Sequence, residues 1–303
     1  MNLRTARACP FAAALLICAI PTWAGPRVEK TLKLQPGGRF VLESYEGSVT
    51  VTGSDQPDVS VVITSNRSDF QSQVDFSFEE DPGMVRVRAF RYSSWHFFDF
   101  LFDYLWLHYE VRVPKATVIE IKTGGGDINA YSLTGRADLK TLGGAIEVSH
   151  LTGDLRAFTS GGSIRVQRIQ GDTELETYGG GIEAISVDGR LKVHTSGGWV
   201  RIDGVTGRVD ASTWGGSIQA IFSKGNARGG VLETSGGSIY AKVDPAANLD
   251  VDASTSGGGG VSTGLPVRVA GAISPHAVRG TLGSGGELLR LHTSGGSVRL
   301  DAL

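Results

Sequence analysis

The sequence predicts an all-β fold, a two-sheet parallel β-solenoid with coils of about 18 residues behind an N-terminal β cap region. The first observation is a block of the form Thr-x-Gly-Gly-x-(Ile/Val)-x-(Ala/Val/Ile) that recurs at this period. It begins at Thr123, Thr141, Thr159, Thr177, Thr195 and Thr213. The second is another glycine twelve residues after each threonine: Gly135, Gly153, Gly171, Gly189, Gly207 and Gly225. A fixed self-similar period is typical of stacked coils.

Residues 1–24 predict a secretory signal peptide. Arg4 and Arg7 precede a short apolar stretch, and Thr22-Trp23-Ala24 places small residues at the −3 and −1 positions. We therefore expect cleavage near Ala24 and an exported protein, located in the periplasm, on the cell surface or outside the cell.

Both cysteines lie in this segment, so the mature chain has no thiol for a disulfide or a metal site. A lipid anchor on Cys18 is the alternative, but lipid-modified cysteines follow a small residue and Ile17 is large. Without Arg4 and Arg7 the chain carries 27 basic and 31 acidic residues, which argues against nucleic acid as a partner. No later stretch reaches the roughly 18 apolar residues of a transmembrane helix.

Residues 25–122 predict an N-terminal β region that begins and caps the stack. A degraded copy of the repeat stands at Ser44-Tyr-Glu-Gly-Ser-Val49-Thr-Val51. Alternating valines indicate further strands, and two of these, at 85–90 and 107–113, read as a hairpin interrupted by an aromatic insertion at residues 90–109.

Residues 123–303 predict the solenoid repeats. With each repeat threonine as position 0, the spacing of apolar residues indicates two short strands per coil, near positions 4–8 and 13–17. Glycines at positions 2–3 and 12 suit the turns between them. The two sheets should face each other across a thin core of one or two apolar residues per strand, in which position 5 forms a buried column. This column contains Ile128, Ile146, Ile164, Ile182, Val200 and Ile218.

Two outward positions support the same register. Position 15 alternates in charge through Asp138, Arg156, Glu174, Lys192, Asp210 and Arg228. Position 6 does so through Glu147, Arg165, Glu183 and Arg201. Opposite charges on stacked strands attract, so we expect two exposed ladders. After Thr213 the period loosens, and the full motif returns at Thr293, as expected of atypical terminal coils.

The recurrent motif behind a signal peptide, entered through Val113-Pro114-Lys115, resembles a bacterial family of adhesin-like, secreted or envelope β-solenoid proteins. The resemblance covers roughly residues 30–300. It implies the solenoid architecture and a role in adhesion. The family offers no catalytic residues to carry over to this sequence.

The aromatic insertion is the first candidate interaction surface. Its large side chains include Trp95, Phe97, Phe98, Phe102 and Trp106. So many apolar groups predict either a plug folded over the first coil or a surface for self-association or docking. A membrane-binding role is weaker, because the segment lacks the Lys and Arg of interfacial helices.

The second candidate is an aromatic strip along the Gly-Gly edge, formed by Tyr178, Trp199 and Trp214 on three successive coils. Such a strip would bind a glycan or an envelope protein, because interfaces favour Trp and Tyr. The alternative is that these rings only cover bare turn backbone.

No catalytic residue, metal site or cofactor is predicted. Asp154 and Asp172 share one position on adjacent coils, as paired glycosidase carboxylates would, but Arg136 and Arg190 bracket them. We therefore expect a non-catalytic, adhesin-like protein that binds a surface, a glycan or a protein partner. The alternatives are a carbohydrate-active β-helix enzyme and a periplasmic accessory or sensor protein for envelope stress.

Overall fold

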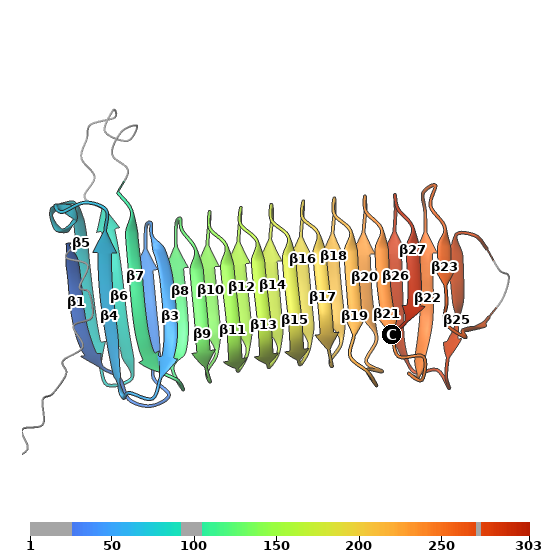
Figure 1. Cartoon of the computed structure of the whole chain (residues 1–303), viewed down its shortest axis with the longest axis horizontal. Coiled ribbons are helices and arrows are strands. Elements are labelled where there is room, and N and C mark those ends of the chain that lie inside the picture. Colours follow the sequence, from blue (N-terminus) through green and yellow to red (C-terminus); the bar gives the residue numbers. More distant parts are fainter. Residues whose placement is uncertain (1–25, 92–104, 271–273) are drawn as a thin grey trace, which may run out of the picture.

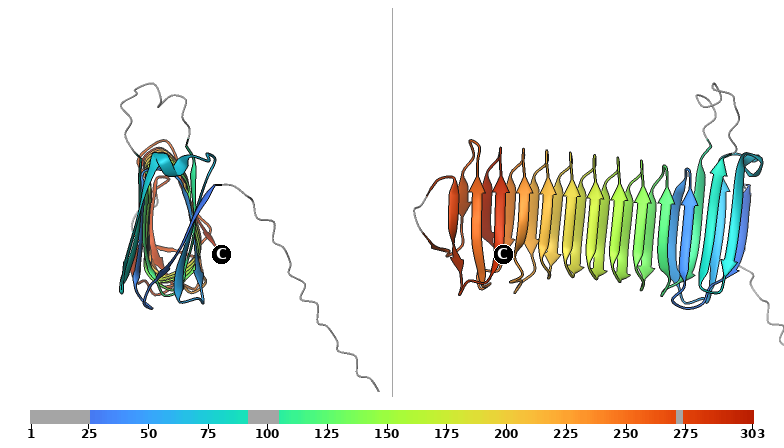
Figure 2. Two further views of the ribbon diagram at one scale, coloured as in Figure 1. Left: turned by 90° about the vertical axis from the view of Figure 1, so that its left-hand side faces the viewer. Right: turned by 180° about the vertical axis from the view of Figure 1, so that it is seen from behind.

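The computed structural model describes residues 26–91, 105–270 and 274–303 and has two long β-sheets that face each other (Figures 1 and 2). The predicted two-sheet solenoid is confirmed. In spatial order, one 13-stranded sheet contains β1 (Arg27–Lys33), β4 (Asp58–Ser65), β7 (Leu107–Pro114), β3 (Ser48–Ser54), β9 (Ile128–Leu133), β11 (Ile146–Thr152), β13 (Ile164–Gln170), β15 (Ile182–Asp188), β17 (Val200–Val205), β19 (Ile218–Phe222), β21 (Ile239–Val243), β27 (Val298–Ala302) and β23 (Val261–Thr263).

The opposite, 14-stranded sheet contains β24 (Arg268–Val269), β25 (Ala277–Leu282), β22 (Leu249–Thr255), β26 (Glu287–Thr293), β20 (Gly230–Thr234), β18 (Val209–Thr213), β16 (Leu191–Thr195), β14 (Thr173–Thr177), β12 (Leu155–Thr159), β10 (Ala137–Thr141), β8 (Val118–Thr123), β2 (Arg39–Ser44), β6 (Met84–Arg91) and β5 (Val74–Asp81). A one-turn helix, α1 (Phe70–Gln73), precedes β5. None of the helices in these described stretches is long and apolar enough to cross a membrane.

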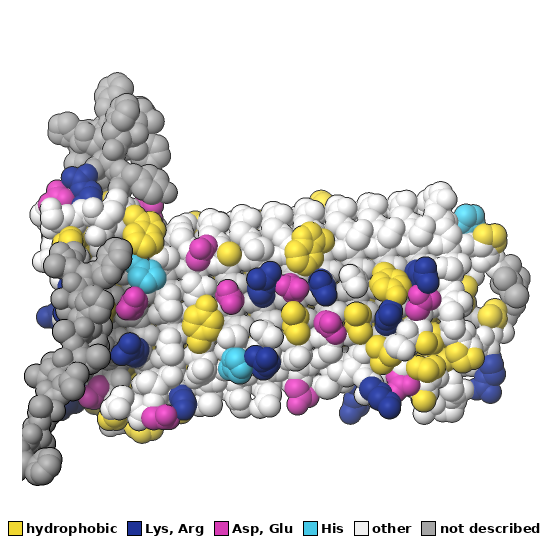
Figure 3. All heavy atoms as spheres, viewed as in Figure 1, with side chains coloured by type: hydrophobic (Ala, Val, Ile, Leu, Met, Phe, Trp, Pro, Cys, Tyr) yellow, Lys and Arg dark blue, Asp and Glu magenta, His cyan; other side chains and the backbone are white. Residues whose placement is uncertain are grey.

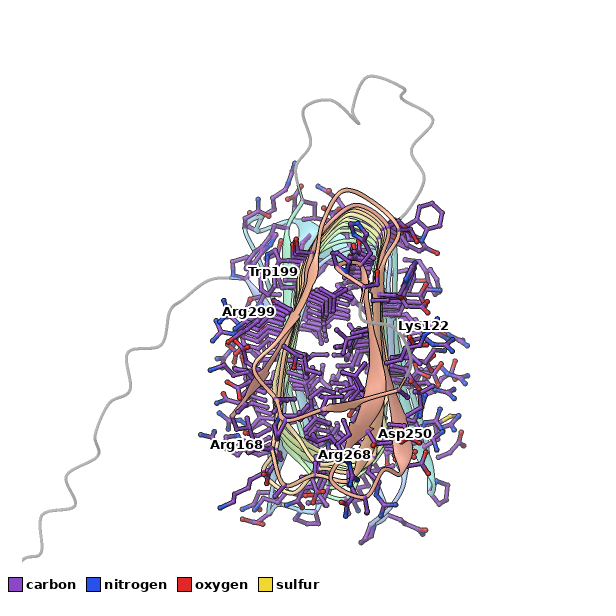
Figure 4. All side chains as sticks on the ribbon, turned by 90° about the vertical axis from the view of Figure 1, so that its right-hand side faces the viewer. Lys122, Arg168, Trp199, Asp250, Arg268 and Arg299 are labelled. Carbon is purple, nitrogen blue, oxygen red and sulfur yellow. The ribbon has the colours of Figure 1, made fainter. Side chains whose placement is uncertain are left out.

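The core runs along the axis between the two sheets. Ile164 pairs in parallel with Ile146 and Ile182, and the whole position-5 column is buried, as predicted. Figure 4 shows rows of side chains that point inward from both sheets. The strands β9 to β17 of the 13-stranded sheet have six or seven residues, longer than expected, and bury three side chains each, such as Ile146, Val148 and Leu151 in β11. The core is therefore thicker than one or two apolar residues per strand.

The repeat threonines are also buried, which the sequence analysis did not anticipate. Each ends a strand of the 14-stranded sheet and points inward at the Gly-Gly edge. The Thr159 hydroxyl donates to the Gly144 carbonyl oxygen at 2.8 Å and accepts from the Gly162 amide at 3.3 Å. A buried hydroxyl or carbonyl without a hydrogen-bond partner is costly. The column of threonine hydroxyls therefore supplies partners to the buried backbone groups of the Gly-Gly turns.

The second glycine of each Gly-Gly pair has no room for a side chain. A Cβ on Gly162 would lie 2.0 Å from the Gly144 carbonyl oxygen of the preceding coil, whereas a Cβ on Gly161 would lie 3.4 Å from its nearest neighbour. The close approach of successive turns is therefore the reason for glycine at position 3.

The outward charge columns follow the predicted register, with one correction. Glu174 stands between Arg156 and Lys192, and its carboxylate lies 3.6 Å and 2.7 Å from their nitrogens. On the other sheet Glu183 lies 2.7 Å from Arg165 and 3.8 Å from Arg201. Figure 3 shows basic and acidic side chains alternating along this face.

Arg228 does not join the first ladder, because Asp210 pairs with Val231 instead. The reason is a longer turn before β20. Asn226 is buried in this turn, where its amide donates to the carbonyl oxygens of Val205 and Gly207. These bonds hold the extra residues outside the strand and shift the register by three.

At both ends a coil distant in sequence is inserted into the stack. β3 lies between β7 and β9, so the degraded repeat takes its place beside the coil of Thr123. At the other end β26 and β27 lie between the coil of Thr234 and the strands β22 and β23. The last repeat along the chain is therefore not the last coil in space.

The predicted hairpin around the insertion is wrong. β6 belongs to the 14-stranded sheet and β7 to the 13-stranded sheet, so the two strands form one coil instead of pairing. Ala89 pairs with Ser44, which in turn pairs with Thr123. β6 thus ends, and β7 begins, at the edge where the repeats have their Gly-Gly turns. Antiparallel strands (β1, β4 and β5 at one end, β24 and β25 at the other) close the stack.

Candidate binding surfaces

Position 1 of the repeat forms an exposed column along the Gly-Gly edge. Leu142, Tyr178 and Trp214 occupy it on alternate coils, with exposed fractions of 53%, 51% and 70%, and the intervening coils carry Ser160 and Ser196. Since adjacent strands lie about 4.8 Å apart, the large side chains stand about 10 Å from one another. We call this set the edge column.

The backbone under the edge column is held coil to coil. The Gly197 amide donates to the Tyr178 carbonyl oxygen at 2.9 Å, and the Gly215 amide donates to that of Ser196 at 3.0 Å. The Tyr178 ring also packs edge-on against Phe158, with centroids 5.5 Å apart, and the Lys140 ammonium lies 5.0 Å from the Phe158 centroid. The aromatic side chains are therefore presented on a rigid base.

Trp199 lies on the opposite flank of the Gly-Gly edge from Tyr178 and Trp214. It stands at position 4, directly before β17 of the 13-stranded sheet, and Figure 4 shows it on the flank opposite Lys122. Its ring lies over Gly181, so a Cβ there would be 2.6 Å from the indole. The three predicted residues thus share one edge but face two flanks, with Tyr178 and Trp214 together and Trp199 across from them.

The aromatic insertion is largely beyond the described residues, which exclude Trp95, Phe97, Phe98 and Phe102. Trp106 is described: its side chain is 43% exposed and stacks on His108, with ring centroids 5.6 Å apart. Its role as a plug or an interaction surface stays a prediction.

The acid pair Asp154 and Asp172 serves the turns of the second edge. The Asp154 carboxylate accepts from the Asp172 amide, and that of Asp172 accepts from the Arg190 amide, each at 3.1 Å. The pair is on the edge opposite Tyr178 and Trp214. Within the described ranges no three His, Cys, Asp or Glu side chains gather as metal ligands would.

A groove with a volume of about 910 Å³ runs along the outer face of the 13-stranded sheet near this second edge, with polar side chains around an apolar floor that includes Leu133, Ile169 and Val187. Position 9 creates it. Ser132, His150, Arg168 and Ser186 have φ between 56° and 59°, and Gly204 follows at 72°. This left-handed conformation breaks the strand alternation, so positions 8 and 9 both face outward. Position 11, which includes Thr152 and Gln170, lines the groove with them.

Sequence reasoning missed two of these features. Leu142 belongs to the edge column but is not aromatic, so the pattern of aromatic residues does not include it. The groove was missed because its position-9 residues differ in type. Gly204 at that phase was the available signal, since glycine marks backbone with positive φ.

The family model described as "Toastrack DUF4097" matches residues 39–301. No curated protein matches the sequence. Among solved structures, a putative adhesin from Parabacteroides merdae is 13% identical, with 91% of this chain and 97% of that chain covered and a TM-score of 0.49. A putative adhesin (BF0245) from Bacteroides fragilis has the same identity and coverages and a TM-score of 0.41.

Proposed function

Because the chain belongs to the Toastrack DUF4097 family, and its repeats present regular columns of exposed side chains, we propose that it is an exported, non-catalytic, adhesin-like binding protein. In this role the solenoid serves as a rigid scaffold and the edge column contacts a glycan or an envelope protein. The observation that carries the proposal is the pair Tyr178 and Trp214, half or more exposed on a backbone fixed by coil-to-coil hydrogen bonds.

The physical reason is the low entropic cost of such contacts. Tyr and Trp supply a large amphipathic area with few rotatable bonds, and their base does not need to be ordered on binding. The serines between them leave space beside each ring and can donate hydrogen bonds. Trp199, on the other flank, would contact a ligand wide enough to extend across the Gly-Gly edge.

The alternative, a carbohydrate-active enzyme, requires a pair of carboxylates beside the aromatic side chains. The acid pair that suggested it binds backbone amides on the far edge, bracketed by Arg136, Arg156, Arg190 and Lys192. This placement supports a binding role over hydrolysis.

The test is a glycan array probed with the purified chain, together with binding to isolated cell envelopes. Tyr178→Ser/Trp214→Ser should lose most of the binding and melt at the wild-type temperature, because both side chains are at the surface. Leu288→Ser removes an apolar side chain that is 37% exposed on β26 and serves as the control. Equal binding by wild type and the double variant would exclude the edge column.

A further inference from the structure

The groove beside position 9 has the composition of a site for a hydroxyl-rich ligand. It extends from Lys115 to Thr206 over successive coils, and Thr134, Thr152, Gln170 and Ser186 line it between these ends. These side chains donate and accept neutral hydrogen bonds. The Thr152 hydroxyl donates to Gln170 Oε1 at 3.3 Å, which leaves the Gln170 amide N–H groups and the lone pairs of the Thr152 hydroxyl for a ligand.

Position 9 carries side chains where the backbone favours glycine. Gly204 adopts the same left-handed conformation without steric cost, while Ser132, His150, Arg168 and Ser186 adopt it against the preference of L-residues. The fold needs the backbone conformation at this position, but it does not need these side chains. Their presence at a cost in backbone free energy points to a use on the surface.

Lys115, Arg168 and Asp188 are charged residues that line the groove, and Figure 4 shows Arg168 pointing away from the sheet. Its guanidinium donates to His150 Nε2 at 3.0 Å, and the ion pairs among the residues that the structure describes do not include it. Lys115 pairs with Asp55 at 2.8 Å, so its charge is engaged. The Asp188 carboxylate is the acidic group of the groove and accepts from the Thr206 hydroxyl at 2.6 Å. Arg168 therefore offers its remaining N–H donors to an anion.

From this arrangement we infer that the groove binds a linear acidic polysaccharide that lies along the solenoid axis. A sugar carboxylate is held by Arg168, and the hydroxyls of neighbouring sugars bond to Thr152, Gln170 and Ser186. An extended peptide fits less well. Its side chains recur on one face every 6.6 Å or so, out of step with coils spaced at about 4.8 Å. This site lies on the opposite edge from the edge column and is independent of the proposed function.

The experiment measures the affinity of the full chain for three acidic polysaccharides: polygalacturonate, alginate and hyaluronate. Methyl-esterified polygalacturonate, which keeps the backbone but lacks the charge, is the ligand control. The inference predicts binding of at least one acidic polymer and about tenfold weaker binding by Arg168→Gln, as expected when a charged hydrogen bond is lost. Arg201→Gln removes the same charge from the same sheet outside the groove and should bind like the wild type.

A second variant separates binding from folding. Ser186→Gly removes one of the proposed ligand contacts and relieves the left-handed strain, so this variant should melt at or above the wild-type temperature while its affinity falls. The inference is overturned if none of the three polymers binds or if the esterified polymer binds equally well. It is also overturned if Arg168→Gln and Arg201→Gln lose affinity alike, or if polyglutamate binds as tightly as the best polysaccharide. Tyr178→Ser/Trp214→Ser should retain this binding, so the two proposals can fail separately.

Discussion

The Thr159 hydroxyl donates a hydrogen bond to the carbonyl oxygen of Gly144, 2.8 Å away and one coil earlier. The same contact recurs up the stack, for example from Thr177 to Gly162 and from Thr195 to Gly180. The threonine that begins each repeat therefore links each Gly-Gly turn to the turn of the preceding coil by a hydrogen bond inside the core.

Thr159→Val should destabilise the protein by about 1–3 kcal/mol, because the nearly isosteric side chain leaves the Gly144 carbonyl and the Gly162 amide without their partner. Thr152→Val makes the same change at an exposed position and should alter stability little. Chemical denaturation of both variants checks this. Equal losses would show that the buried ladder has no special role.

Two neighbouring glycines should respond very differently to alanine. Gly162→Ala places a Cβ 2.0 Å from a backbone oxygen, so the turns must separate and the unfolding free energy should fall by several kcal/mol, as for other severe backbone clashes. Gly161→Ala meets only ordinary contacts and should stay within about 1 kcal/mol of wild type. Thermal unfolding distinguishes them, and similar melting temperatures would contradict the stacking of the turns.

The charge ladder should contribute modestly and in a salt-dependent way. Lys192 donates a hydrogen bond to Glu174 and thereby lowers the pKa of that carboxyl, with Arg156 adding a smaller effect. Arg156→Glu would put three acids in a row with Asp138 and Glu174, and should cost about 1 kcal/mol at low salt. Denaturation in low and high salt tests this, because screening should shrink the loss. A loss of the same size at both salt concentrations would argue against an electrostatic origin.

The pKa of Tyr109 should make the protein sensitive to alkali. Burial raises this pKa above the ordinary value of 10, and the phenol is within 2.8 Å of the Ser44 hydroxyl. Above pH 10 the folded phenol keeps its proton while the unfolded one loses it. The native state then binds more protons, so stability falls as the pH rises. Tyr109→Phe should lose about 1 kcal/mol at neutral pH and show a weaker decline above pH 10.

Tyr178→Phe is the matched control for this measurement. Its phenol is half exposed, so the variant should retain the alkaline loss of the wild type. Stability curves that coincide for Tyr109→Phe and wild type across the alkaline range would contradict the account.

The sequence was sufficient for the repeating part of the fold because periodicity and burial have the same physical cause. A residue such as Ile164 must be apolar in every coil, so its column is visible without a structure. The absence of Arg228 from the charge ladder could not be predicted, because the residue spacing does not show that Asn226 turns inward and lengthens the coil. The position of β26 and β27 in the stack could not be predicted either, because Thr293 matches both Thr234 and Thr255 in register.

The candidate surfaces were predictable only in part, for a related reason. Exposed residues face solvent and are free to vary, so their grouping depends on which flank of the edge each one occupies. Trp199 and Trp214 are close in phase, but Trp199 directly precedes β17 of one sheet and Trp214 directly follows β18 of the other. The groove depends on a backbone conformation at position 9 that side-chain types such as His150 and Arg168 do not reveal.

The claim on which every column, ladder and groove depends is that residues 18 apart lie side by side in parallel coils. Cysteines at Ser149 and Gln167, which pair across β11 and β13, test it in a mature chain predicted to contain no cysteine. Neighbouring strands bring the two Cα atoms to about 4.8 Å, within the range for a disulfide. The account predicts rapid disulfide formation under mild oxidation for Ser149→Cys/Gln167→Cys, and little for the offset pair Glu147→Cys/Gln167→Cys. Faster cross-linking of the offset pair would contradict the register and, with it, the proposed surfaces.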